Sequence, residues 1–275
     1  MSAAALDHVG IAGPDLDALG IAYARLGFRL TPRAQHHAPG PDGVVRPIGT
    51  GNRCAMLRQG YLELIAVIDP ALPSNTLDRF LARYHGLHIV AFEIADPEAE
   101  LARLRAAGMA IPGIAWLERP LDAPGGPATA RFARLPMPEA PEGRIQLIRH
   151  LTPELLWQPD LLDHPNRAVA LEEVALVVAN PAASADRFAR LVGVAATPTA
   201  DGLLLALPRG RVRFTTGDPY PGVTPPCLPC IAGVTLRTDD GGAAIRRIAG
   251  AAGRETADGF LVPPAEAGGA ALLFR

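Results

Sequence analysis

The sequence predicts an α+β fold of four βαβββ modules that pair into two domains, each a curved mixed sheet around a cup. Three observations predict it: a fourfold repeat, the strand candidates after each helix, and a break near the middle of the chain. Each repeated stretch is an apolar strand, a helix-start signal and a helix that ends at glycine. The four stretches begin at Leu6, Leu87, Leu171 and Ile231.

The predicted helices have recognisable ends. Two begin at an N-cap residue followed by proline, Asp96 with Pro97 and Asn180 with Pro181. The predicted left-handed C-caps are Gly27, Gly108, Gly193 and Gly253.

Short strand candidates follow each helix and complete the modules, for example "NRCAMLRQGYLELIAV", "GRIQLIRH", "LLLALPRGRVRFTT" and "GFLVPP" with "AALLFR". One module cannot cover its own concave face, so modules must pair, and two pairs make two domains. The predicted N-terminal domain is 1–150, the Pro-rich linker is 151–170, and the second domain is 171–275. Residues 75–86 are predicted to form an amphipathic helix between the first two modules.

Composition limits the function classes. The chain has 275 residues, 49% of them hydrophobic, and a net charge of −2, so it offers no basic field for nucleic acid or an anionic membrane. It contains no lysine, which excludes lysine Schiff-base and P-loop chemistry. No apolar run reaches the ~18 residues of a membrane span, and no signal peptide is evident. Three cysteines give no disulfide framework, which fits a reducing cytoplasm. We further expect a small-molecule substrate, and a monomer or homodimer.

Four polar residues occupy matching strands of the first two modules. His8 lies in the first strand of module one, and His88 is aligned with it in module two. Glu63 and Gln146 lie in the last strands of the same modules, 55 residues after His8 and 58 after His88. Pairing of the modules would bring the four side chains to the centre of the cup.

Two imidazoles, a carboxylate and an amide oxygen suit a divalent metal such as Zn, Ni, Co, Mn or Fe(II), and open coordination positions would make it catalytic. The alternative is four unrelated polar residues, each satisfied locally. Burial without a partner would cost about 1 to 3 kcal/mol for each group, which favours the metal.

These residues and the repeat resemble the vicinal oxygen chelate (VOC) superfamily, and "LDHVGIAGPDLDALGIAYARLGF", "GTGNR", "GYLELIAV" and "HLTPELLW" resemble its glyoxalase-like domain branch. The resemblance covers residues 5–160 and is one of the repeat alone over 168–275. It implies two glyoxalase-like (VOC) domains and a metal held by His, Gln and Glu, as in methylmalonyl-CoA epimerase and glyoxalase I. Here the lone carboxylate lies in module one, which distinguishes the chain from enzymes with a glutamate in module two.

The second domain lacks the quartet. Glu173 and Arg213 stand at the places of His8 and Glu63, and module four has Gly233 and Leu272. The second domain is therefore predicted to be a degenerate copy, a structural element or a pocket wall.

Other candidates lie near the mouth of the cup. Thr50, Asn52 and Arg53 belong to "GTGNR", where Arg53 either grips an anionic group of the substrate or is a solvated arginine beside a capped turn. His36 and His37 lie in a Pro/Gly-rich stretch predicted as a surface loop, with His37 as a substrate contact. His150 is expected to close the pocket, and Cys227 and Cys230 receive no role.

The sequence thus favours a metal-dependent lyase, isomerase or epimerase of a small oxygen-chelating substrate with a carbonyl or carboxylate group, in which Glu63 is both ligand and base. One alternative is an Fe(II) extradiol-type dioxygenase that uses His8, His88 and Glu63. The other is a non-catalytic protein that sequesters a ligand, as resistance proteins do.

Overall fold

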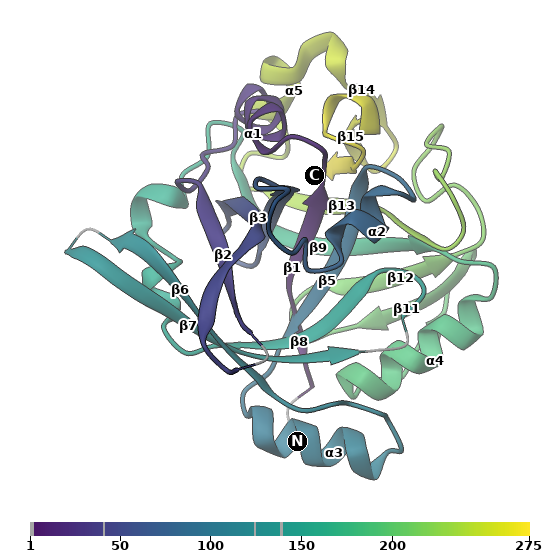
Figure 1. The fold of residues 1–275 in the computed structure, drawn as a ribbon. Coiled ribbons are helices and arrows are strands. Elements are labelled where there is room, and N and C mark those ends of the chain that lie inside the picture. Colours follow the sequence, from purple (N-terminus) through teal and green to yellow (C-terminus); the bar gives the residue numbers. More distant parts are fainter. Residues whose placement is uncertain (1–2, 41, 124, 138–139) are drawn as a thin grey trace.

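The structure is a computed structural model that describes residues 3–40, 42–123, 125–137 and 140–275. Within these residues it contains two eight-stranded mixed sheets (Figure 1). The strand orders are β2-β3-β4-β1-β5-β8-β7-β6 and β10-β11-β12-β9-β13-β16-β15-β14. The predicted α+β fold with four βαβββ modules in two sheets is confirmed.

The first sheet is formed by β1 (Ala5–Ala12), β2 (Ala34–Pro39), β3 (Val45–Met56), β4 (Tyr61–Val67), β5 (Gly86–Glu93), β6 (Ala115–Ala123), β7 (Gly126–Met137) and β8 (Arg144–His150). At its centre β1 and β5 pair antiparallel, and each has a parallel neighbour, β4 and β8 respectively. The edge strands β2 and β6 approach each other, so the sheet is nearly closed into a barrel. Its concave face therefore surrounds an interior space.

The second sheet repeats this plan with β9 (Ala168–Val177), β10 (Thr197–Pro198), β11 (Gly202–Ala206), β12 (Arg211–Thr215), β13 (Cys230–Thr238), β14 (Arg254–Thr256), β15 (Gly259–Val262) and β16 (Ala271–Phe274). Its central antiparallel pair is β9 with β13, and the parallel neighbours are β12 and β16. Short 3₁₀ turns lie at Pro153–Leu155, Pro159–Leu161, Gly250–Ala252 and Pro264–Glu266.

The helices are α1 (Leu16–Arg25), α2 (Leu77–Leu81), α3 (Pro97–Ala106), α4 (Pro181–Val192) and α5 (Ala243–Ala249). Asp96 and Asn180 cap α3 and α4 as predicted. Two expectations were wrong. The helix predicted over 75–86 is only α2, because Asn75 and Thr76 adopt left-handed backbone conformations. Module four ends its helix at Gly250, whereas Gly253 is extended.

The two halves of the chain share one apolar core. Phe28 packs near Phe274, and Phe92 near Phe188, with ring centroids 6.1 and 6.2 Å apart. The helices pair in the same way, with α1 beside α5 and α3 beside α4 (Figure 1). Module one therefore packs against module four, and module two against module three.

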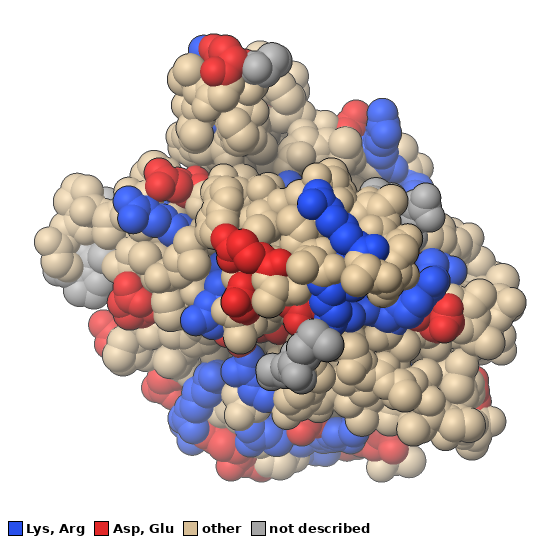
Figure 2. All heavy atoms as spheres, turned by 90° about the horizontal axis from the view of Figure 1, so that it is seen from below, with Lys and Arg blue, Asp and Glu red and all other residues tan. Residues whose placement is uncertain are grey.

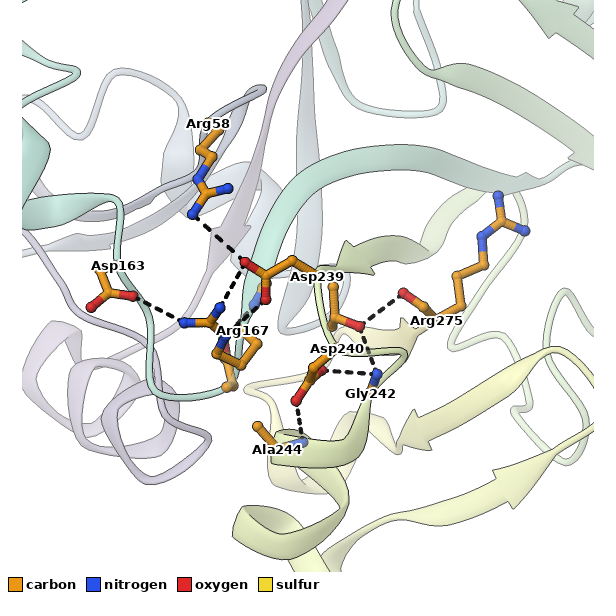
Figure 3. Close-up of polar contacts among 11 residues, drawn as sticks. Arg58, Asp163, Arg167, Asp239, Asp240, Gly242, Ala244 and Arg275 are labelled. Carbon is orange, nitrogen blue, oxygen red and sulfur yellow. Dashed lines mark hydrogen bonds and ion pairs between the residues drawn. The ribbon is translucent and has the colours of Figure 1, made fainter.

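An ion-pair network reinforces this junction (Figure 3). Arg167, just before β9, forms two hydrogen bonds of 2.7 and 3.0 Å with the carboxylate of Asp239, which follows β13. Arg58, in the turn before β4, lies 3.6 Å from the same carboxylate. The turn that leads into β4 is thus tied to the second half.

Charged side chains of both signs are mixed on the face that carries α3 and α4 (Figure 2). The ion pairs there include Arg103 with Glu100 at 2.6 Å and Arg190 with Asp186 at 3.4 Å. All the basic side chains are arginines. Among the described residues, no helix is long and apolar enough to cross a membrane.

Candidate active site

The first sheet encloses a cavity of about 260 Å³. Its walls come from β1 to β8, and the apolar lining includes Ile65, Ile89, Ile148, Leu117 and Phe132. On β4 and β8 the lining residues alternate, Tyr61, Glu63 and Ile65 on the one and Arg144, Gln146 and Ile148 on the other, because successive side chains of a strand point to opposite faces. The cavity is therefore the cup that the sequence predicts.

Three of the four predicted metal ligands, His8, Glu63 and Gln146, line this cavity. Glu63 lies opposite Gly10 in the β1–β4 pair, and Gln146 lies opposite Ala91 in the β5–β8 pair. These are equivalent places in the two modules. The Oε1 atom of Gln146 is buried and has no hydrogen-bond partner among the described residues.

His88 lies outside the cavity, so the structure does not assemble the expected quartet. Ile11 pairs with Leu87 and Gly10 with Ile89, which leaves His88 as the extra residue of a β-bulge. The residue equivalent to His8 is Ile89, because each stands seven positions before the N-cap of its helix. The alignment of His88 with His8 was wrong by one residue, and a one-residue shift places a side chain on the opposite face.

The side chain of His88 is instead part of the packing around α2. Its ring lies 5.3 Å from that of Phe80 and 3.9 Å from that of Tyr84. Its Nε2–H donates to the carbonyl oxygen of Tyr84 at 2.8 Å. Burial lowers the pKa of His88 to about 4, so it is neutral at neutral pH.

His8 is oriented by a buried carboxylate. Asp7 Oδ2 lies 2.6 Å from His8 Nδ1 and 3.1 Å from His150 Nε2. Burial acts to raise the pKa of Asp7, but the two imidazoles outweigh it and hold that pKa far below its usual value. An ionised carboxylate only accepts, so both imidazoles donate to it. In neutral His8 the Nε2 lone pair is then available, and Tyr61 stacks on the ring at 4.3 Å.

The ligand atoms of Asp7, His8 and His150 lie within 4.8 Å of one another. Because one oxygen of Asp7 is shared between both imidazoles, we interpret this cluster as a support for His8. His150 was expected to close the pocket, but it is buried behind His8 and does not line the cavity.

Glu63 is held in place by its neighbours. Asn52 Nδ2 donates to Glu63 Oε1 at 2.6 Å, and Arg119 Nη1 donates to Asn52 Oδ1 at 3.0 Å. Burial acts to raise the pKa of Glu63, but His36, His8, the Asn52 amide and Arg119 together lower it below its ordinary value. Glu63 is therefore ionised at neutral pH. The predicted residue Asn52 lines the cavity and orients this carboxylate.

His36 and His37 lie on the edge strand β2, so the predicted surface loop was wrong. The prolines and glycines around them end the strand rather than prevent it. Both histidines line the cavity, and His36 Nε2 lies 3.6 Å from Glu63 Oε1. Burial lowers the pKa of His36 to about 4, opposed by Glu63 and aided by Arg119 and Arg144. Thr50 is buried and does not line the cavity; its Oγ1 forms a 2.9 Å hydrogen bond with His36 Nδ1, which does.

Arg53 lies outside the cavity. It follows Asn52 on β3 and so points to the opposite face, where its Cδ is 3.5 Å from the place a Cβ on Gly20 would take. Its Nη2 is 3.9 Å from Asp17 on α1. The structure therefore gives Arg53 no contact with a ligand in the cup.

Three other arginines line the cavity, one each from β6, β7 and β8: Arg119, Arg134 and Arg144. Burial lowers the pKa of Arg144 to about 10, with a further contribution from the charge of Arg134. The sequence analysis missed all three. One signal was present, because Arg144 stands two residues before Gln146 and so shares its face of the strand.

In the second sheet, side chains occupy the region that corresponds to the cavity of the first sheet. Glu173 pairs with Arg213 at 3.1 Å, and the Arg213 guanidinium lies 5.5 Å from the centre of the Tyr220 ring. A Cβ on Gly233 would lie 2.4 Å from that ring, while Leu272 belongs to the apolar core. An ion pair and an aromatic ring thus take the place of the polar residues in the first cup. Cys227 and Cys230 are free thiols.

Buried neutral histidines predict a stability that depends on pH. The pKa of His88 is lowered, so the unfolded chain binds more protons, and the free energy of unfolding should fall as the pH drops from about 6.5 toward 4. The slope from one such group is at most about 1.4 kcal/mol per pH unit. In urea unfolding at several pH values, His88→Gln should show a smaller slope. His85→Gln, a change at an exposed neighbour, should behave like the parent. An unchanged slope in His88→Gln would contradict the assignment.

Comparisons with known proteins agree with this architecture. A hypothetical protein from Staphylococcus aureus shares 12% identity over 99% of each chain, with a TM-score of 0.72. The Mn(II)-bound glyoxalase from Novosphingobium aromaticivorans shares 16% identity over 100% of this chain and 82% of that one, with a TM-score of 0.53. A mutant 4-hydroxymandelate synthase from Streptomyces coelicolor shares 13% identity over 90% and 75% of the chains, also with a TM-score of 0.53. At these identities the likeness shows the fold.

The family follows from the sequence match. No curated protein sequence matches the chain. A family model described as a glyoxalase-like domain matches residues 6–192, which include the first sheet except Ala5, and also β9 and α4. The chain therefore belongs to the family of proteins with a glyoxalase-like domain.

Proposed function

We propose that this protein is a metal-dependent enzyme that moves a proton next to a carbonyl group of a small oxygen-chelating substrate, as a lyase, isomerase or epimerase. His8, Glu63 and Gln146 would hold a divalent ion from the set Zn, Ni, Co, Mn and Fe(II). The observation that carries the proposal is the buried Oε1 of Gln146, which lacks a partner among the described residues and lines the same cavity as Glu63 and His8.

The donor set fits such an ion. An imidazole nitrogen, a carboxylate and an amide oxygen together suit borderline divalent metals. His8 has the further feature that its Nδ1–H donates to Asp7, and metal-binding histidines commonly make this kind of contact with a carboxylate. That contact leaves Nε2 as the nitrogen able to bind.

A bound divalent metal would polarise a substrate oxygen and acidify the adjacent C–H bond. Glu63 is ionised at neutral pH and is the carboxylate best placed to accept that proton. Asn52 fixes its Oε1, and Arg119 in turn fixes Asn52. The isoleucines and Phe132 of the lining limit the water around the reacting atoms.

The placement of His88 counts against the dioxygenase alternative in the form that uses His8, His88 and Glu63, because His88 is committed to Tyr84 outside the cavity. A protein that only sequesters a ligand would not need an oriented imidazole, a fixed carboxylate and a free amide oxygen in one cup. The proton-transfer enzyme accounts for all three.

The test is an elemental analysis of protein purified without chelator. We expect one divalent metal per chain in the parent and a large loss of metal in Gln146→Leu. Glu93→Gln is the matched control, because Glu93 pairs with Arg149 and Arg209 outside the cavity. Full metal content in Gln146→Leu, or a metal bound at Cys227 and Cys230, would contradict the proposal.

A further inference from the structure

We infer that Arg119, Arg134 and Arg144 form an oxyanion subsite in the cavity, which binds a carboxylate or phosphate group of the substrate. The inference deepens the proposed function and rests on it, since it names the substrate class of the same cavity. The substrate would carry this anionic group in addition to the oxygens next to the reacting carbon.

The first argument is the balance of charge inside the cavity. Its charged lining residues are the three arginines, Glu63 and Glu118. Glu118 is an exposed residue that pairs with Arg131 at 3.2 Å. Glu63 is then the single carboxylate opposite three guanidinium groups in the described lining. A divalent ion beside Glu63 would raise the excess of positive charge further, so an anionic ligand is needed to balance it.

The second argument is the unused hydrogen-bonding capacity of these arginines. The side chain of Arg134 makes no hydrogen bond or ion pair with any described residue, and its buried Nε has no partner. The Nε of Arg119 is likewise buried without a partner, while its Nη1 donates to Asn52. Two guanidinium groups in the wall of one cavity thus each carry an Nε donor that has no acceptor among the described residues. A desolvated charge without a partner is costly, and a planar guanidinium fork suits carboxylate and phosphate oxygens.

The third argument is that neighbouring elements hold the group in place. Arg144 Nη2 donates to the backbone oxygen of Asn75 and to Thr76 Oγ1, in the turn before α2. Its guanidinium lies 5.5 Å from the centre of the Phe80 ring. Arg119 is fixed by Asn52, which also fixes Glu63. The position of the anionic group is therefore linked to the position of the proposed base.

The experiment compares three small probes on the full chain as purified: malonate, inorganic phosphate and the neutral malonamide. A ligand that binds the folded state raises the melting temperature with its concentration. We expect malonate, phosphate or both to raise it, and malonamide to leave it unchanged. Binding of malonate alone would identify a carboxylate as the anionic group, and binding of phosphate alone would identify a phosphate.

Arg134→Met is the decisive variant. It should raise the dissociation constant of the binding anion about tenfold to a hundredfold, the usual range for loss of charge-assisted hydrogen bonds. Without any anion it should melt at or above the temperature of the parent, because an unpaired buried charge is removed. Arg131→Met, a change at an exposed site on the same strand, should bind the anion like the parent. A merely structural role for Arg134 would instead lower the melting temperature and leave anion affinity unchanged.

Two results would overturn the inference: no stabilisation of the parent by either anion, or equal anion affinity in Arg134→Met and Arg131→Met. The anion titration is repeated after the metal has been removed and the chelator dialysed away. Binding that disappears in that repeat places the anion on the metal and also overturns the inference. Metal content is measured separately. If the protein binds no metal but still binds the anion through Arg134, the proposed function fails and the anion subsite remains.

Discussion

Glu63→Gln is expected to lower turnover by about 10² to 10⁴, the range usual for loss of a general base, while much of the metal stays bound. The amide keeps an oxygen that can bind a metal but has no basic carboxylate to take a proton. The measurement is exchange of deuterium from D₂O into the C–H bonds of a panel of 2-oxo and 3-oxo dicarboxylates, followed by NMR. The substrate that the parent exchanges fastest is then used for the variant.

Two checks make the result specific to Glu63. Metal content is measured in the same samples, so that loss of turnover can be separated from loss of the ion. Glu93→Gln makes the same chemical change outside the cavity and should exchange at the parent rate. If metal-loaded Glu63→Gln keeps turnover within about threefold of the parent, Glu63 is only a ligand. His36 would then be the base to test, because its neutral imidazole lies 3.6 Å from Glu63.

Asp7→Asn should weaken metal binding about tenfold to a hundredfold, with a parallel loss of turnover. Asp7 contacts both His8 Nδ1 and His150 Nε2, so the amide would remove the ionised acceptor that fixes the tautomer of His8. The measurement is a competitive metal titration against a chromophoric chelator. It needs no knowledge of the substrate.

The matched control is Asp96→Asn. Asp96 is the N-cap of α3, a position where aspartate and asparagine serve almost equally well. It should keep both metal affinity and stability. If Asp7→Asn binds metal as tightly as the parent, Asp7 has only a structural role and the proposed orientation of His8 is wrong.

The fold was predictable because its signals are local. Helix caps such as Asp96 and Asn180 and the repeated strand–helix order mark each module without knowledge of its partners. Glu63 and Gln146 were also predictable, since regular alternation along β4 and β8 sets the face on which each lies. The pairings of β4 with β1 and of β8 with β5 contain no bulge, so the alternation is not interrupted.

The remaining errors have physical causes that a single sequence does not reveal. The bulge at His88 depends on how β1 and β5 pair, and it changes the face of one residue. Arg53 was expected at the substrate together with Asn52, because the sequence alone does not show which side chains of β3 face the cavity. Arg119 and Arg134 were missed because arginines on strands are usually solvated, and nothing in the sequence around β6 and β7 distinguishes these two from surface arginines. Only the curling of the sheet turns them inward.

The shared apolar core has a consequence for how the site can be studied. The first sheet carries every cavity residue described above, yet Phe28 and Phe92 are covered by Phe274 and Phe188 from the other half. A fragment cut at the connection near residue 165 would expose these aromatic faces to water and would be prone to aggregation. The second half thus covers apolar surface of the first, as a partner subunit would. It supplies no residue to the proposed chemistry, but substitutions in its core are expected to abolish activity without touching the cavity.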